Sequence, residues 1–188
     1  TLGGRMTVFS RARGFAYPGP PGSAPPLLAQ HDWVHLVADY GTKEESELEV
    51  FAFIARANDD PRGFSLLAMV VSLFETGYLR AGAGLFESFP GQLSREGVAV
   101  RVADAMRRGA LVDGSVDFLA VDWFELAALP IEEVRARFGV VPKDPGAIAA
   151  GSVGPWEPGG ISEYQDRAGR EHAASHGQPY DPFGASIS

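Results

Sequence analysis

Cysteine is absent from this chain of 188 residues, and its absence excludes several kinds of site. Without a thiol there can be no disulfide, no thiolate zinc site and no cysteine nucleophile. Any metal site built from this sequence must therefore use histidine, aspartate or glutamate ligands. Because the chain has only 4 histidines, the places where a histidine stands close to an acid are the first candidates for a functional site.

Positive charge is scarce as well. The 16 lysines and arginines are outnumbered by 24 aspartates and glutamates, which gives a net charge of -8 at pH 7. Such a chain has no basic field to attract phosphates, so the charge balance argues against sequence-independent nucleic-acid binding. We therefore expect no nucleic-acid partner.

The chain also lacks a hydrophobic run long enough for a membrane span. Its longest dense apolar stretch, residues 63–74, is well short of the roughly 20 residues that a bilayer requires. Apolar residues occupy nearly every side of a helix built from this stretch, a pattern typical of a helix at the centre of a bundle. We therefore expect a central helix there, with a buried or a membrane-touching helix both open, and not a membrane span.

Strand signals are few, and residues 111–121 are the one candidate. Helical periodicity, by contrast, recurs along the chain and favours an all-α fold, arranged as a compact helical bundle. The expected helices cover residues 26–39, 43–57, 64–79, 95–108, 122–128 and 130–138.

The two ends of the chain are rich in glycine and proline. Residues 1–26 hold too many prolines for a helix or a central strand, so we expect an irregular N-terminal arm. Beyond Pro142 the periodicity is lost, which predicts a Gly/Pro-rich, weakly ordered tail over residues 143–188. The expected helical, metal-binding domain is then residues 1–142.

A cluster of candidate ligands begins in the segment HDWVHLVADYGTKEESE, residues 31–47. At 100° per residue, His31, Asp32 and His35 fall within an arc of about 100° on the first helix, so they share one face. Apolar residues surround them on the same helix. This polar face therefore needs a partner other than bulk water.

The acids of the next helix divide into two groups. Glu47 lies in the middle of an apolar arc, whereas Glu45 and Glu49 fall on the opposite side, which we expect to face solvent. Thr42 is expected to cap this helix, with Glu45 as its capping-box partner. Because a short turn makes the two helices antiparallel neighbours, Glu47 is expected to meet the two histidines.

Two imidazoles with one or two carboxylates suit a divalent metal, for which zinc is favoured and iron or manganese would also fit. The residues leave two other interpretations open. One is a buried hydrogen-bond network without a metal. The other is a metal-dependent hydrolase, because the spacing of His31 and His35 resembles the H-E-x-x-H helix of zinc proteases, although Asp32 is shorter than the glutamate of that motif. A second pair at this spacing, His172 and His176, lies in the expected tail and is interpreted as chance or weak adventitious metal binding.

The pattern H-D-x-x-H, followed after 11 intervening residues by E, resembles the signature of the coenzyme Q (ubiquinone) biosynthesis protein Coq-four family, and here it reads His31, Asp32, His35 and Glu47. Three flanking segments are also similar to that family: TLGG at the start, ADYGT after the motif and AVDWFELAALPIEEVRARFGV further along. The resemblance covers residues 1–141.

The resemblance implies an all-helical protein whose four motif residues bind a divalent metal. It implies oxidative decarboxylation of a polyprenylated hydroxybenzoate ring, or of a related aromatic substrate, by a metal-dependent lyase. The implied partners are a prenylated aromatic or isoprenoid lipid and other quinone-biosynthesis proteins, with a homodimer left open. We expect a cytoplasmic location with peripheral contact at the inner face of the membrane. A non-catalytic, lipid-binding scaffold for a quinone-biosynthesis complex is the alternative function.

Overall fold

The structure, a computed structural model, describes residues 1–16, 26–77 and 89–187. Across these ranges the all-α prediction is confirmed: no strand is formed, and residues 111–121 adopt turns and irregular backbone. The α-helices are α1 (Leu2–Arg13), α2 (Pro26–Val37), α3 (Glu44–Ala57), α4 (Arg62–Glu75), α5 (Val98–Ala110), α6 (Trp123–Leu126), α7 (Ile131–Arg137), α8 (Pro145–Ala149) and α9 (Glu163–Ser175). Two short 3-10 helices are η2 (Gln92–Ser94) and η3 (Ala185–Ile187).

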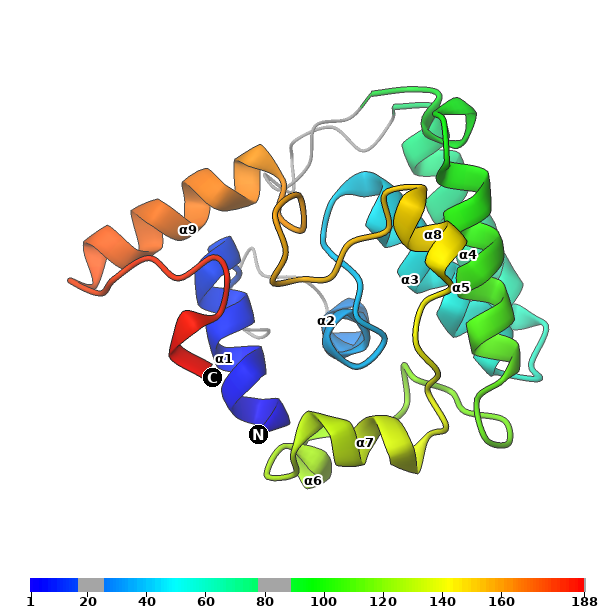
Figure 1. Cartoon of the computed structure of the whole chain (residues 1–188), viewed down its shortest axis with the longest axis horizontal. Helices are drawn as coiled ribbons and strands as arrows, with labels where there is room; N and C mark the ends of the chain where they lie inside the picture. The colour runs from blue at the N-terminus through cyan, green and yellow to red at the C-terminus, as the bar shows by residue number, and fades with distance from the viewer. Residues whose placement is uncertain (17–25, 78–88, 188) are drawn as a thin grey trace.

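The helices form two groups with α2 between them (Figure 1). Helix α3 packs against α4 and α5 on one side, and α1 packs against α9 on the other. Helix α2 contacts α1, α3 and α7, and its second half is buried. Aromatic rings fill the core beside it, where Trp33 of α2 stacks on Trp123, which stacks in turn on Phe118. Polar side chains on α2 therefore lie near the centre of the molecule and need partners there.

Helix α1 lies where the sequence predicts an irregular arm. The Thr1 side chain caps its N-terminus, and Leu2, Met6 and Phe9 recur at helical spacing and are buried. Packing of this apolar stripe outweighs the low helix propensity of the two glycines in the first turn. The remainder of the expected arm, residues 17–25, falls outside the described part of the chain.

The C-terminal segment also differs from the weakly ordered tail that its composition suggests. It forms α8 and α9, and α9 begins with a capping box in which Ser162 and Gln165 each bind the other's backbone N–H. Helix α9 packs across α1 so closely that a Cβ on Gly169 would lie 2.0 Å from the carbonyl oxygen of Ala12. Gly169 therefore allows a close contact between two helices and does not indicate disorder.

Replacing Gly169 by alanine is expected to lower the free energy of unfolding by about 2 kcal/mol, because the added methyl must push α9 away from α1. Urea unfolding followed by circular dichroism measures the loss. Gly4→Ala is the matched control, since its Cβ would meet only the Thr1 hydroxyl, at 3.2 Å, and alanine favours a helix. Equal stability of the two variants would contradict the close packing of α9 on α1.

The expectation that residues 63–74 form a central helix is wrong. Helix α4 covers this stretch, but it buries one face against α3, through Leu67, Val70 and Phe74. Phe64 and Met69 are 43% and 47% exposed, so α4 presents apolar side chains on its outer face. Among the helices of the described residues, none combines the length and the hydropathy needed to cross a membrane.

Helix α3 differs from the prediction at its start and at one acid. It begins at Glu44 with Lys43 as N-cap, and no side chain caps it, so Thr42 does not have the expected role. Glu49, expected to face solvent, is fully buried and its carboxylate accepts a hydrogen bond from Arg101 of α5 at 2.7 Å. The arginine of a neighbouring helix thus makes it possible to bury an acid that the pattern of α3 alone assigns to the surface.

Candidate metal centre

The four residues singled out by the sequence come together where α2 meets α3. His31, Asp32 and His35 share one face of α2, and each offers a ligand atom within 4.8 Å of those of the other two. Glu47, in the first turn of α3, is buried and faces this group, as its position in the apolar arc predicts. The geometry expected from the spacing of the motif is therefore present.

Glu47 joins the two histidines. Its Oε2 lies 3.2 Å from Nε2 of His31, and its Oε1 lies 3.3 Å from Nε2 of His35. Nε2 of His31 is also 3.6 Å from Oδ1 of Asp32. Both imidazoles thus turn the same nitrogen toward the carboxylate of Glu47, where α2 meets α3.

The other ring nitrogen of His35 determines its tautomer. Nδ1 lies 2.7 Å from the carbonyl oxygen of Gly41, and because a carbonyl only accepts, Nδ1 must carry the proton. In the neutral ring, Nε2 then has a lone pair, yet it is buried, faces Glu47 and has no hydrogen-bond partner among the described residues. A lone pair opposite a carboxylate oxygen is stabilised by a cation between the two. The donor set therefore fits a divalent metal, with the Gly41 carbonyl holding the ring in the ligating orientation.

Aromatic rings enclose the site, and it is more open at one end. Phe51 stacks on His31 with 5.0 Å between ring centroids, and Phe9 lies 5.8 Å from His35. His35 is fully buried, whereas the side chains of His31 and Asp32 are 17% and 22% exposed. A molecule approaching from solvent would therefore meet the site at the end formed by His31 and Asp32.

The two carboxyl groups of the site differ in acidity. Burial alone would raise the pKa of Glu47, but in the metal-free site the close contacts with His35 and His31, whose rings attract a carboxylate once they are protonated, lower that pKa to about 2. For Asp32, burial outweighs the attraction of the same histidines and raises the pKa. Glu47 is therefore the carboxylate that stays charged, and Asp32 is the one that takes up a proton more readily.

The depressed pKa of Glu47 is expected to make the stability of the metal-free protein depend on pH. As the pH falls from 4.5 toward 2, the unfolded chain binds a proton that the folded chain does not, so the folded state loses stability. Over this range the free energy of unfolding of the wild type is expected to fall by about 3 kcal/mol more than that of the Glu47→Gln variant. Urea unfolding of EDTA-treated protein across this range tests it. Parallel pH profiles would show that the histidines do not hold Glu47 ionised.

The turn that carries Gly41 is held by the C-terminal segment. The N–H of Gly41 donates to the carbonyl of Val153 at 2.9 Å, and the N–H of Thr42 donates to that of Gly160 at 2.8 Å. Gln165 binds Thr42 twice: its Oε1 accepts from the threonine hydroxyl, and its Nε2 donates to the threonine carbonyl at 3.0 Å. The carbonyl that orients the buried histidine is therefore positioned by residues more than 100 positions later in the sequence.

Arg13 connects α1 to the same turn. Its side chain is fully buried, and its Nε donates to the hydroxyl of Thr42 at 2.9 Å. The rest of the guanidinium donates to the carbonyl oxygens of Phe9, Pro155 and Gly160. Burial lowers the pKa of Arg13 to about 9, which leaves it charged at neutral pH. The positive charge of Arg13 attracts the carboxylates of Asp32 and Glu47 and so stabilises their negative charge.

Arg13 and Gln165 were not among the residues that sequence patterns singled out, although each has a local signal. Arg13 continues the helical spacing of the buried stripe on α1, and Gln165 completes an S-x-x-Q capping-box pattern that starts at Ser162. Their partner Thr42 is distant in sequence, so neither pattern reveals the contact. His172 and His176 form a separate group on α9, where they line a cavity against α1.

Comparison with known proteins adds no relative. No protein-family model, no curated protein and no solved structure matches the chain. The function must therefore be argued from the geometry of the centre and from the motif that builds it.

Proposed function

We propose that this protein is a metal-dependent enzyme of quinone biosynthesis that decarboxylates a polyprenylated hydroxybenzoate or a related aromatic acid. The observation that carries the proposal is the buried Nε2 of His35, which faces Glu47 at 3.3 Å and forms no regular hydrogen bond within the part of the chain that the structure describes. A metal ion would satisfy both groups. The choice of substrate rests on the resemblance of the motif from His31 to Glu47 to the Coq-four family.

His31, His35 and Glu47 would hold the metal, with Asp32 beside them. Zinc is favoured, and iron or manganese would accept the same nitrogen and oxygen ligands. When bound, the metal would supply a Lewis acid that binds a phenol or carboxylate oxygen of an aromatic acid at the open end of the site and stabilises negative charge there. The protein would contribute the fixed orientation of His35, which the carbonyl of Gly41 provides, and the permanent charge of Glu47.

Asp32 is the proposed proton donor. Decarboxylation adds a proton to the ring carbon, breaks its bond to the carboxylate and returns that electron pair to the ring as carbon dioxide leaves. Asp32 lies at the open end of the site, with Oδ1 3.6 Å from Nε2 of His31, whereas the buried Glu47 contacts both histidines. The two acids can then have separate roles, one as a ligand and one as a proton source.

Carbon dioxide release from a prenylated hydroxybenzoate tests the proposal. Asp32→Asn is expected to remain folded, to keep its metal and to lose about 100-fold in rate, because a carboxamide cannot donate the proton. Glu47→Gln is expected to lose metal and activity together. If the wild type releases no carbon dioxide with zinc, iron or manganese, the protein is not this enzyme.

A non-catalytic lipid-binding scaffold is the second candidate, and the exposed Phe64 and Met69 of α4 favour it. Their apolar surface would contact an isoprenoid lipid or the surface of a membrane at its inner face. Other quinone-biosynthesis proteins would then be the partners, in the cytoplasm. If the protein is a scaffold, Phe64→Glu and Met69→Glu should abolish its co-sedimentation with liposomes. Asp32→Asn should leave the function of the scaffold unchanged. Liposome binding unaffected by either glutamate would exclude α4 as the contact.

A further inference from the structure

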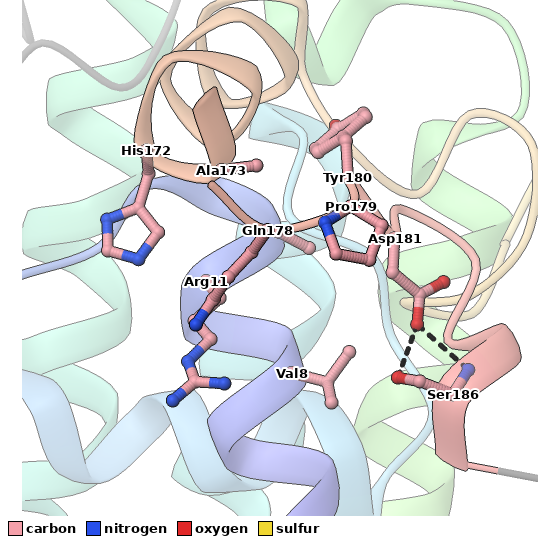
Figure 2. Close-up of a pocket in the computed structure, with 10 residues that line it drawn as sticks. Val8, Arg11, His172, Ala173, Gln178, Pro179, Tyr180, Asp181 and Ser186 are labelled. Atoms are coloured by element: carbon pink, nitrogen blue, oxygen red, sulfur yellow. Dashed lines mark hydrogen bonds between the residues drawn. The ribbon is translucent and has the colours of Figure 1, made fainter. Parts of the chain in front are cut away.

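The C-terminal end of α9 carries two histidines in contact, His172 in the last turn and His176 at the C-cap. His172 and His176 have ring centroids 4.2 Å apart and ring planes inclined by 31°. His172 lines two adjoining cavities of about 220 and 450 Å³ against α1, and His176 lines the larger. In Figure 2, His172 and Arg11 lie on one side of the smaller cavity, and Asp181 and Ser186 lie on the other. The pair that the sequence places in a weakly ordered tail is therefore held on a helix beside open space.

The backbone of α9 sets the tautomer of His176. Its Nδ1 lies 2.8 Å from the carbonyl oxygen of His172, which only accepts, so Nδ1 carries the proton. The hydroxyl of Ser175 donates to the same carbonyl at 2.8 Å and lies 3.0 Å from Nδ1, where it can accept. Nε2 of His176 consequently presents its lone pair, and this side chain is exposed. The arrangement is the same as at His35, where a backbone carbonyl also fixes Nδ1.

His172 is available as the second ligand. Its ring centroid lies 4.2 Å from that of His176, and its side chain lines both cavities, so the two imidazoles stand together beside open space. The neutral form of an imidazole has a lone pair that can bind a metal. Two such rings on successive turns of one helix face are the spacing that chelates a transition metal.

We propose that His172 and His176 form a second, solvent-accessible site for a divalent transition metal, with water completing the coordination. Copper(II) should bind most tightly and nickel(II) and zinc less so, because that is their order for nitrogen ligands. The site lies at the C-terminal end of α9, where the helix dipole favours a cation. It does not depend on the function proposed for the α2–α3 centre.

Arg11 limits the affinity of this site for a bare metal ion and favours an anionic ligand on a metal that is bound there. Its side chain lines both cavities with His172 and is close enough to influence that ring electrostatically. A guanidinium repels a bare metal ion, so its removal should tighten binding. The same charge would attract an anionic ligand to the open coordination positions of a bound metal.

Titration of the EDTA-treated, tag-free chain with nickel(II) alone, followed by calorimetry, tests the proposal. Wild type should bind one nickel ion at the α9 pair in addition to any bound between α2 and α3. His176→Ala and His172→Ala should each weaken the α9 event by at least about 10-fold. Arg11→Gln should strengthen it by about threefold.

Glu163→Gln, at the opposite end of α9, is the matched control and should leave nickel binding unchanged, because it alters the charge of the same helix without touching the pair. His176 is exposed, so its alanine variant should fold, and circular dichroism confirms this. Unaltered nickel binding in both histidine variants would overturn the proposal. Weaker nickel binding by Arg11→Gln would also overturn the proposal, because Arg11 would then support metal binding instead of repelling the ion.

Discussion

Replacing His35 by alanine is expected to abolish tight metal binding between α2 and α3. His35 is the fully buried member of the proposed ligand set, and its Nδ1 is fixed by the Gly41 carbonyl. Wild type reconstituted with zinc and dialysed to remove weakly held ions should retain about one equivalent, and His35→Ala should retain less than about a tenth. Elemental analysis of the dialysed proteins measures both.

His172→Ala is the matched control for this experiment, because it removes a histidine from α9 and leaves the α2–α3 centre complete. It should retain the tightly bound equivalent. If the wild type itself keeps less than about half an equivalent of zinc, iron or manganese after reconstitution, the four side chains form a hydrogen-bond network and not a metal centre. The enzyme proposal would fall with that result, whereas the weaker α9 site is tested separately by nickel.

Replacing Arg13 by methionine is expected to lower the free energy of unfolding by about 4 kcal/mol. The variant keeps the apolar stem but leaves the carbonyl of Pro155 and the hydroxyl of Thr42 without their guanidinium donor. The carbonyl of Gly160 loses one donor and keeps the N–H of Thr42. Urea unfolding of the EDTA-treated protein measures the loss. Zinc affinity should also fall, because the turn at Gly41 that orients His35 loses one of its supports.

Arg11→Met is the control for Arg13, since it removes an arginine from the same helix at an exposed position, and it should change stability by less than about 0.5 kcal/mol. Arg13→Lys should recover only part of the loss, because one ammonium cannot reproduce the planar fork of a guanidinium. Equal stability of the Arg13→Met and Arg11→Met variants would refute the role of Arg13 in joining α1 to the centre.

The convergence of His31, Asp32, His35 and Glu47 could be predicted because it depends on local geometry. Three of the residues share a face through the helical repeat, and a short turn brings the next helix back alongside. The assignment of Glu47 to the interior follows from its apolar neighbours on one helix face. Each of these steps uses fewer than about 20 consecutive residues, so none of them needs a partner from elsewhere in the chain.

The predictions that failed depend on partners far away in sequence. Glu49 belongs to the polar side of α3, and only Arg101 of α5, which meets it at 2.7 Å, makes its burial possible. Helix α4 is apolar on most sides, which suggests a central position, yet one face alone packs on α3. Periodicity describes which residues share a face, and it contains no information on which element covers that face.

The sequence by itself determined the all-α class and the face shared by the candidate ligands, because helix periodicity and short turns are local properties of the chain. Only the tertiary structure decided how the centre is supported. Arg13 and Gln165 reach Thr42 from opposite ends of the chain, and together they hold the turn whose Gly41 carbonyl orients His35. Such contacts depend on how helices pack in three dimensions, so no spacing within the motif could have revealed them.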